Sequence, residues 1–222
     1  MKLLAIIPVY NESKNIGMVV EAIKKKGLDV VVIDDGSDDN SGKIACQKGA
    51  EVLRNSKRQG KGFSLREGIN YAKDKTYDGV ITMDGDGQHD ASDIDSFRSL
   101  AENSAADIIV GNRMEETKDM PFIRFLTNKF MSLIISLSCR QHIPDTQCGY
   151  RYLSKRALKD LKLYSDDFEI ETEMLMQLSK KKFRIHSVKI RTIYQGEESK
   201  IRPLKDTFRF FRYYFREAFK KN

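Results

Sequence analysis

Two aspartates separated by one residue are the most chemically suggestive feature of this sequence. Asp84 and Asp86 follow the apolar run 79–83, which predicts a buried strand, and precede the segment 91–94, which predicts a helix start. Both carboxylates should therefore lie where a strand ends, at the edge of an open α/β sheet where ligands bind. Two anions held this close repel each other unless a cation lies between them. The spacing predicts a site for a hard divalent ion, Mg²⁺ or Mn²⁺, that shares its coordination shell with substrate phosphates.

Two other interpretations of the acidic stretch must be weighed. Asp-Gly pairs also occur in plain surface turns, so a turn without a metal is the simplest alternative. An EF-hand calcium loop counted from Asp84 would need Gly at its sixth position and Glu at its twelfth. Those positions hold His89 and Asp95, which excludes the EF-hand.

Composition and charge limit the class of protein. The chain has 222 residues, 40% of them hydrophobic, which is enough for one sizeable domain. The formal net charge is +7, but residues 200–222 alone carry eight basic residues against two acidic ones. The remainder is close to neutral, which argues against a nucleic-acid-binding surface. A local anionic partner near that end explains the charge better.

The cysteines and the apolar runs indicate a cytosolic protein. Cys46, Cys139 and Cys148 show no metal-binding spacing, so we expect reduced thiols. No signal peptide is expected, because the first two residues run straight into a strand pattern. The longest apolar stretch, 130–137, is shorter than the ~20 residues that a membrane span needs.

Strand and helix patterns alternate through the first half. They predict strands at 3–10, 30–33, 51–54, 79–83 and 107–110. They also predict helices at 16–26, 63–75 and 94–102, and one that begins after the Ser/Asp cluster 34–41 and ends at about 49. This alternation predicts a parallel sheet with helices on both faces. Pro8 should end the hydrogen-bond ladder of the first strand. The sequence contains neither a P-loop nor a G-x-G-x-x-G after the first strand, so those nucleotide sites are not supported.

The second half is less regular and ends in an amphipathic pattern. We expect helices at 122–138, 168–181 and 203–221, and strands near Tyr152 and at 183–194. The last helix would place five large apolar side chains on one face, flanked by basic residues: Leu204, Phe208, Phe211, Phe215 and Phe219. This composition predicts an interfacial helix on an anionic membrane surface, with packing on the domain as the alternative.

Seven short stretches stand in a characteristic order. They are 8–12, 33–38, 60–62, 84–89, 111–113, 145–151 and 168–171. Together they closely resemble the family 2 glycosyltransferases with the GT-A fold, above all the branch that transfers mannose or glucose to dolichol or polyprenol phosphate. The resemblance implies an α/β fold with a mostly parallel, helix-flanked nucleotide-binding sheet and a C-terminal amphipathic helix. It also implies one domain over 1–200, with 1–113 for the nucleotide sugar and metal and 114–200 for the acceptor, followed by the helix 201–222.

The resemblance also implies roles for individual residues. The pocket for base and ribose would be lined by Pro8, Tyr10, Asn11, Glu12 and one of Asp34 or Asp35. The metal ligands would be Asp84, Asp86 and Gln88, which leaves His89 to hydrogen-bond within the loop. Arg113 and Arg124 match positions near phosphates. Lys61, on a glycine loop, would follow the donor diphosphate, with a plain solvated charge as the alternative.

The implied reaction is an inverting transfer of a hexose from GDP-mannose or a UDP-hexose, in one in-line displacement. The metal ligand Asp86 would be essential, because the metal takes up charge on the leaving diphosphate. A lipid phosphate acceptor is already ionised, so it needs cations rather than a base; the candidates are Arg113, Arg124, Arg151 and Lys200. A neutral hydroxyl acceptor would instead need Asp145 or Glu171 as base. Arg151 could also form a structural ion pair with Glu169 or Glu171.

The expected location is the cytoplasm, peripherally on the inner face of the membrane, with a polyprenyl phosphate as acceptor and no nucleic-acid partner. This branch often carries C-terminal transmembrane helices, and none is expected here. Membrane attachment would then depend on the terminal helix or on a membrane-protein partner. The alternatives are a family 2 enzyme with a soluble or glycan hydroxyl acceptor, and a non-enzymatic nucleotide-binding module. A haloacid-type phosphatase is disfavoured by Gln88 and Pro8 at its motif positions.

Overall fold

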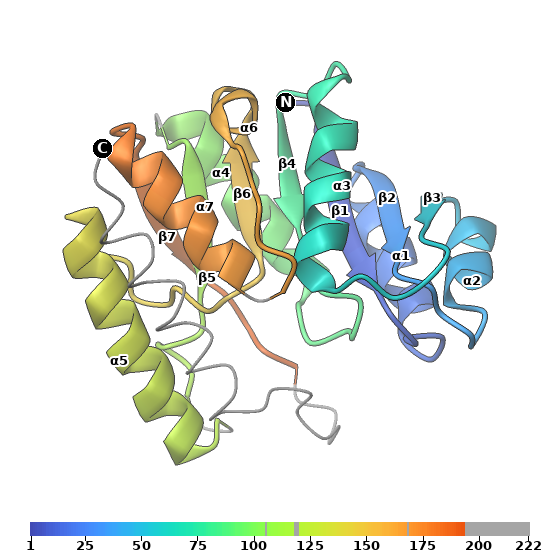
Figure 1. Ribbon diagram of the computed structural model, residues 1–222, viewed down its shortest axis with the longest axis horizontal. Helices are drawn as coiled ribbons and strands as arrows, with labels where there is room; N and C mark the ends of the chain where they lie inside the picture. The colour runs from blue at the N-terminus through green and yellow to red at the C-terminus, as the bar shows by residue number, and fades with distance from the viewer. Residues whose placement is uncertain (105, 118–119, 168, 194–222) are drawn as a thin grey trace.

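A seven-stranded sheet organises the computed structural model, which describes residues 1–104, 106–117, 120–167 and 169–193 (Figure 1). The strand order is β3-β2-β1-β4-β6-β5-β7. All pairs are parallel except those of β6, which runs antiparallel to β4 and β5. The strands are β1 Leu3–Val9, β2 Asp29–Asp34, β3 Glu51–Arg54, β4 Gly79–Thr82, β5 Ile108–Asn112, β6 Arg151–Ser154 and β7 Ile185–Lys189. The predicted mostly parallel sheet is confirmed.

Strand β1 pairs with both β2 and β4 and is buried along its whole length. Pro8 does not end it: Pro8 pairs with Ile33 of β2, and the strand continues to Val9. The expectation of a break there is wrong for a geometric reason. The carbonyl of Ile6 accepts a hydrogen bond from the Met83 N–H, so it points toward β4. Backbone groups of alternate residues point to the same side of a strand, so those of Pro8 also point toward β4. Because β4 ends at Thr82, the missing N–H of Pro8 removes no ladder bond.

Helices cover both faces of the sheet. In Figure 1 α3 and α7 lie on the near face, and α1 and α4 lie on the far face. The helices are α1 Ile16–Lys25, α2 Ser41–Gln47, α3 Lys61–Lys73, α4 Ile94–Asn103, α5 Phe122–Cys139, α6 Lys155–Asp160 and α7 Glu169–Lys180, with a 3₁₀ turn at Ala91–Asp93. The short α6 has no counterpart in the sequence prediction; the hydroxyl of Ser154 caps it by accepting from the Ala157 N–H. The terminal helix expected at 203–221 lies outside the described residues.

The strand register gathers the polar loops at one edge of the sheet. Val9 pairs with Asp34, and Ile6 pairs with Thr82, so β1, β2 and β4 end side by side. The loops that follow these strands are 10–15, 35–40 and 83–90, and they contain most of the predicted donor-site residues. The carboxyl edge of the parallel strands is therefore the candidate site, as expected for an open α/β sheet.

Close packing of α3 on β1 holds this edge in place. A Cβ added at Gly68 would lie 2.3 Å from Cγ2 of the fully buried Ile6. Glycine at this position lets the helix approach the strand more closely than any other residue would allow.

We predict that Gly68→Ala lowers the free energy of unfolding by about 1–2 kcal/mol, although alanine has the higher helix propensity. The cause is overlap between the new methyl group and Ile6. Urea denaturation followed by circular dichroism measures the loss. Asn70→Ala, on the exposed side of the same helix, is the control and should stay within about 0.5 kcal/mol of wild type. Equal midpoints for the two variants would contradict the prediction.

Candidate active site

Two of the predicted donor loops are joined by hydrogen bonds. The Asn11 N–H donates to Ser37 Oγ (3.0 Å), and the Glu12 N–H donates to Ser41 Oγ (2.8 Å). Asn11 has a φ of 56°, a left-handed conformation that asparagine tolerates better than most residues. The Pro-Val-Tyr-Asn-Glu and Asp-Asp-Gly-Ser motifs thus form one continuous side of the site.

An aromatic ring and a cation lie together beside these loops. The guanidinium of Arg58 lies 4.2 Å from the ring centroid of Tyr10, which is half-buried just after β1. An aromatic ring can stack on a nucleotide base, and a neighbouring cation can interact with the phosphates of the same nucleotide. In the sequence Arg58 is marked only by its neighbours Lys57 and Lys61, which make this loop basic.

Neither aspartate of the 34–35 pair is exposed. Asp34 Oδ1 accepts from the Ser37 N–H (2.8 Å), and its Oδ2 is buried without a hydrogen-bond partner. Both oxygens of Asp35 are used: Oδ1 accepts from the Gln59 N–H and Oδ2 from the Gly60 N–H, each at 2.8 Å. Asp35 therefore shapes the glycine loop, a role that the sequence analysis did not anticipate.

Lys61 connects the two halves of the site. Its Nζ lies 2.7 Å from Asp84 Oδ1 and 2.8 Å from Glu171 Oε1, and Glu171 is in the first turn of α7. Burial acts to lower the pKa of Lys61, but Asp84 and Glu171 outweigh it and raise the pKa above its usual value. This lysine is a buried ion-pair partner, so the alternative of a plain solvated loop charge is wrong.

Glycines make room for this contact. Gly60 has a φ of 108°, which side chains rarely adopt. A Cβ added at Gly149 would lie 3.1 Å from both Asp84 Oδ2 and Lys61 Nζ. The sequence analysis assigned no role to Gly149, although a glycine between Cys148 and Tyr150 in a polar turn is typical of a close approach.

The two carboxylates of the D-x-D pair lie in different electrostatic surroundings. Burial tends to raise the pKa of Asp84, but the charge of Lys61 outweighs it and lowers that pKa to about 2. Burial, together with the nearby charge of Asp84, raises the pKa of Asp86 to about 6. Asp86 also accepts a hydrogen bond from the Gln88 N–H (2.9 Å). Asp86 is therefore the carboxylate whose negative charge still lacks sufficient compensation.

The donor set fits a hard divalent ion that binds together with a substrate. Among the described residues no three His, Cys, Asp or Glu side chains are grouped so that they could hold a metal by themselves. The predicted set of Asp84, Asp86 and Gln88 supplies oxygen ligands only and leaves coordination positions for phosphate and water. Mg²⁺ and Mn²⁺ prefer such a shell.

His89 takes no part in this donor set. Its Nδ1 accepts a hydrogen bond from the Asp84 N–H (3.2 Å), and burial lowers its pKa to about 4. Its ring packs on Tyr150, with centroids 5.0 Å apart. The expected loop role of His89 is confirmed, and Tyr150 is a fully buried core residue.

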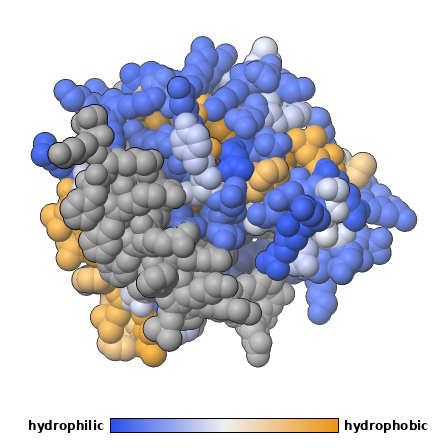
Figure 2. All heavy atoms as spheres, in the orientation of Figure 1, coloured by the Kyte–Doolittle hydropathy of each residue, from blue (hydrophilic) through white to orange (hydrophobic). Residues whose placement is uncertain are grey.

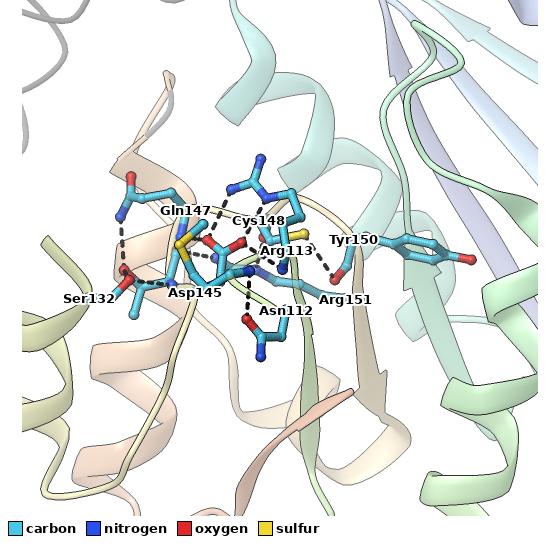
Figure 3. Close-up of polar contacts among 10 residues, drawn as sticks. Asn112, Arg113, Ser132, Asp145, Gln147, Cys148, Tyr150 and Arg151 are labelled. Atoms are coloured by element: carbon cyan, nitrogen blue, oxygen red, sulfur yellow. Dashed lines mark hydrogen bonds and ion pairs between the residues drawn. The ribbon is translucent and has the colours of Figure 1, made fainter. Parts of the chain in front are cut away.

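On the acceptor side Arg113 is held by a two-point ion pair (Figure 3). Its Nε lies 2.7 Å and its Nη2 3.0 Å from the two carboxylate oxygens of Asp145. Asp145 is fully buried, and its carboxylate accepts these bonds as well as one from the Arg113 N–H. The structure therefore corrects the expectation that Asp145 acts as a general base: it orients Arg113, directly after β5.

Arg151 is also structural (Figure 3). The side chain, labelled in Figure 3, is fully buried. It donates to the backbone carbonyls of Cys148, Thr146 and Glu171. These contacts contradict the expected role at the acceptor phosphate, because no part of the guanidinium is accessible. They also differ from the structural ion pair with Glu169 or Glu171 that was the alternative, since Arg151 donates to the backbone carbonyl of Glu171 and not to its carboxylate. Arg151 thus joins the 145–149 turn to the start of α7.

The other two acceptor-side cations are less well defined. Arg124 is half-buried in the first turn of α5. Lys200 lies outside the described residues, so its role stays a prediction.

We predict that Arg151→Met lowers the free energy of unfolding by about 3 kcal/mol or more, because it leaves buried carbonyls without donors. Arg184→Met, at an exposed position ahead of β7, is the matched control and should change little. Chemical denaturation of both variants measures the difference. A wild-type unfolding curve for Arg151→Met, combined with a raised KM for the acceptor, would restore the substrate role.

Comparison with known proteins agrees with this geometry. The profile of Glycosyl transferase family 2 matches residues 4–162. A UDP-N-acetylglucosamine–dolichyl-phosphate N-acetylglucosaminyltransferase from Methanococcus voltae is 32% identical over 212 residues, covering 85% of this chain and 84% of the relative. An undecaprenyl-phosphate mannosyltransferase from Micrococcus luteus is 29% identical over 175 residues, covering 73% of this chain and 70% of the relative.

Solved structures share the fold. The glucosyl-3-phosphoglycerate synthase of Mycobacterium tuberculosis, crystallised with Mn²⁺, UDP and glucosyl-3-phosphoglycerate, superposes with a TM-score of 0.71 at 17% identity, covering 95% of this chain and 76% of that chain. The fold is of the GT-A type. Since the family profile matches most of its length, this chain belongs to glycosyl transferase family 2 and is a glycosyltransferase.

Proposed function

We propose that this enzyme transfers a sugar, with inversion, from a nucleoside diphosphate to a membrane polyprenyl or dolichyl phosphate, with Mg²⁺ or Mn²⁺ at Asp84 and Asp86. One observation supports this above all others. The register of β1 and β4 brings the loop with Asp84 and Asp86 to the carboxyl edge of the sheet, where Lys61 Nζ lies 2.7 Å from Asp84 Oδ1, while burial and the charge of Asp84 raise the pKa of Asp86. A divalent ion bound to a diphosphate supplies the missing charge.

The donor side provides the remaining contacts. The Asn11–Ser37 and Glu12–Ser41 hydrogen bonds shape one side of the base pocket, and Tyr10 supplies its aromatic face. When bound, the metal would act as a Lewis acid on the leaving diphosphate. GDP-mannose and UDP-hexoses are the donor candidates. The Mn²⁺ and UDP in the mycobacterial synthase, which shares the fold, are consistent with this class of donor.

The state of the two candidate bases favours an acceptor that is already ionised. Asp145 is buried against Arg113, and Glu171 is paired with Lys61. A neutral hydroxyl acceptor would need one of these carboxylates to leave its cation and take up a proton. A phosphate monoester needs no such base. It needs a cation near its oxygens, and Arg113, oriented by Asp145, is the candidate. The names of the archaeal and bacterial relatives specify lipid phosphates of this kind.

Helix α5 supports a membrane location. Six of its large apolar side chains are 49–72% exposed: Phe122, Ile123, Leu126, Phe130, Leu133 and Leu137. Figure 2 shows hydrophobic residues gathered at the lower left, where α5 lies in Figure 1. The charged residues of the helix, Arg124 and Lys129, are both basic, which suits an anionic lipid surface.

Helix α5 also extends what the sequence analysis considered. The apolar stretch 130–137 is only the second half of this helix. By length and composition the full 18-residue helix could cross a membrane, with a mean hydropathy of 1.3 and 28% of it buried. Its contacts with α7 attach it to the domain. We propose peripheral association with the inner face of the membrane through this exposed side, with the predicted 201–222 helix or a membrane-protein partner as a further attachment.

We predict that Asp86→Asn abolishes sugar transfer while the fold survives. Wild type and variant are incubated with Mn²⁺, vesicles containing polyprenyl phosphate and, one at a time, GDP-mannose or UDP-hexoses. Radiolabelled sugar in the lipid fraction is the measurement. The metal-free variant should be as stable as wild type or more stable by about 1–2 kcal/mol near neutral pH, because burial of an ionised Asp86 opposes folding above its raised pKa.

Full transfer by Asp86→Asn would remove the metal from the proposal. Transfer by wild type to a soluble glycan, but not to the lipid phosphate, would replace the acceptor. Nucleotide binding without turnover on any acceptor would favour the non-enzymatic module.

We predict that the double variant Leu126→Glu, Leu133→Glu loses most vesicle binding, because each glutamate would have to be inserted into the lipid interface. Flotation with anionic vesicles measures the bound fraction. Met18→Glu, at a 59% exposed position on α1, is the matched control and should float like wild type. The same assay on a chain ending at Arg202 separates the contribution of the terminal segment. Unchanged flotation of the double variant would contradict a role for α5.

A further inference from the structure

Lys61 is built into the centre of the carboxylate cluster. Its side chain is 19% exposed, and those of its partners Asp84 and Glu171 are 28% and 8% exposed. A lysine in this setting holds two acidic groups that come from opposite halves of the site. Without its charge both carboxylates would be left undercompensated and partly desolvated.

The backbone around Lys61 is equally defined. Asp35 binds the N–H groups of Gln59 and Gly60, and the Phe63 N–H donates to the Asp166 carbonyl (3.1 Å). A Cβ added at Gly62 would lie 2.5 Å from the carbonyl carbon of Asp166. The loop backbone is thus fixed on both sides of Lys61, which holds the ammonium group in one position against Asp84.

We infer that Lys61 is an internal counter-cation that competes with the divalent ion for Asp84 and is retained by Glu171 when the ion binds. The inference rests on the proposed metal site at Asp84 and Asp86. A magnesium ligand oxygen lies about 2.1 Å from the ion. Asp84 Oδ1 already lies 2.7 Å from the ammonium nitrogen, so sharing this oxygen would place two cations close together. Their repulsion favours transfer of the ammonium toward Glu171.

This arrangement gives Lys61 a positioning role. In the absence of metal it keeps Asp84 compensated, and after metal binding Glu171 still compensates the ammonium. The earlier expectation for Lys61, contact with the donor diphosphate alone, makes a different prediction. Under that role the lysine would affect nucleotide affinity and leave the affinity for Mn²⁺ alone unchanged.

The test is a titration of metal-free protein with Mn²⁺ alone, with free ion measured by electron paramagnetic resonance. We expect Lys61→Met to bind Mn²⁺ roughly tenfold more tightly than wild type, since a competing positive charge is gone. Metal-free Lys61→Met should also melt at a lower temperature than wild type and gain more from added Mn²⁺. Lys57→Met, on the exposed part of the same loop, is the control and should match wild type in both measurements.

A second variant covers the case in which Lys61→Met does not fold. Lys61→Gln is neutral but keeps an amide donor for Asp84 and Glu171, and it too should bind Mn²⁺ more tightly. If wild type binds Mn²⁺ and the neutral variants bind it with equal or lower affinity, the inference is overturned. The proposed function would still stand in that case. Absence of Mn²⁺ binding by wild type without nucleotide would overturn the inference, and absence of binding also in the presence of UDP would overturn the metal site.

Discussion

Neutralisation of buried negative charge at the carboxyl edge of the sheet is the constraint on which this structure depends. Strand register brings the loops after β1, β2 and β4 to that edge, and the D-x-D pair lies in one of them. Lys61 compensates Asp84, while Asp86 remains in an environment that opposes its ionisation. The proposed divalent cation would compensate this charge and that of a departing diphosphate.

The acceptor side relies on arginines to order irregular backbone. The turn at 145–149 has no regular ladder, yet its carbonyl groups lie in the interior and require donors. Arg151 supplies these donors at two points of the turn and at the start of α7. Asp145, held in this turn, then orients Arg113. Arg151 therefore stabilises the turn, and the turn positions Arg113 through Asp145.

Helix α7 contacts both the charged cluster and the apolar helix α5. Glu171 of α7 contacts Lys61 from the donor side, and the same helix packs on α5, whose outer face is apolar. An enzyme that joins a water-soluble nucleotide sugar to a lipid phosphate needs such an arrangement. The charged cluster is partly buried, and an apolar surface lies on α5, which packs against the helix that carries Glu171.

Local sequence determined much of this protein. Aliphatic runs of strand length and amphipathic helical stretches were sufficient to predict nearly all elements up to Lys189, because burial on a sheet imposes those periodicities. The ordered motifs also identified the family and the D-x-D pair. Two features were missed. The six-residue α6 is too short for a periodic pattern, and β1 continues through Pro8 because the missing N–H faces the side where β4 has already ended.

Only the tertiary structure decided which charges meet. Sequence spacing cannot show that Lys61 reaches Glu171, 110 positions away, or that Asp145 is already paired with Arg113. The fully buried Arg151 looks in sequence like any arginine of a polar turn. Residue type sets which ions a side chain can attract, whereas burial and long-range proximity set which it holds, and those come only from the packing of α3, α7 and the sheet against one another.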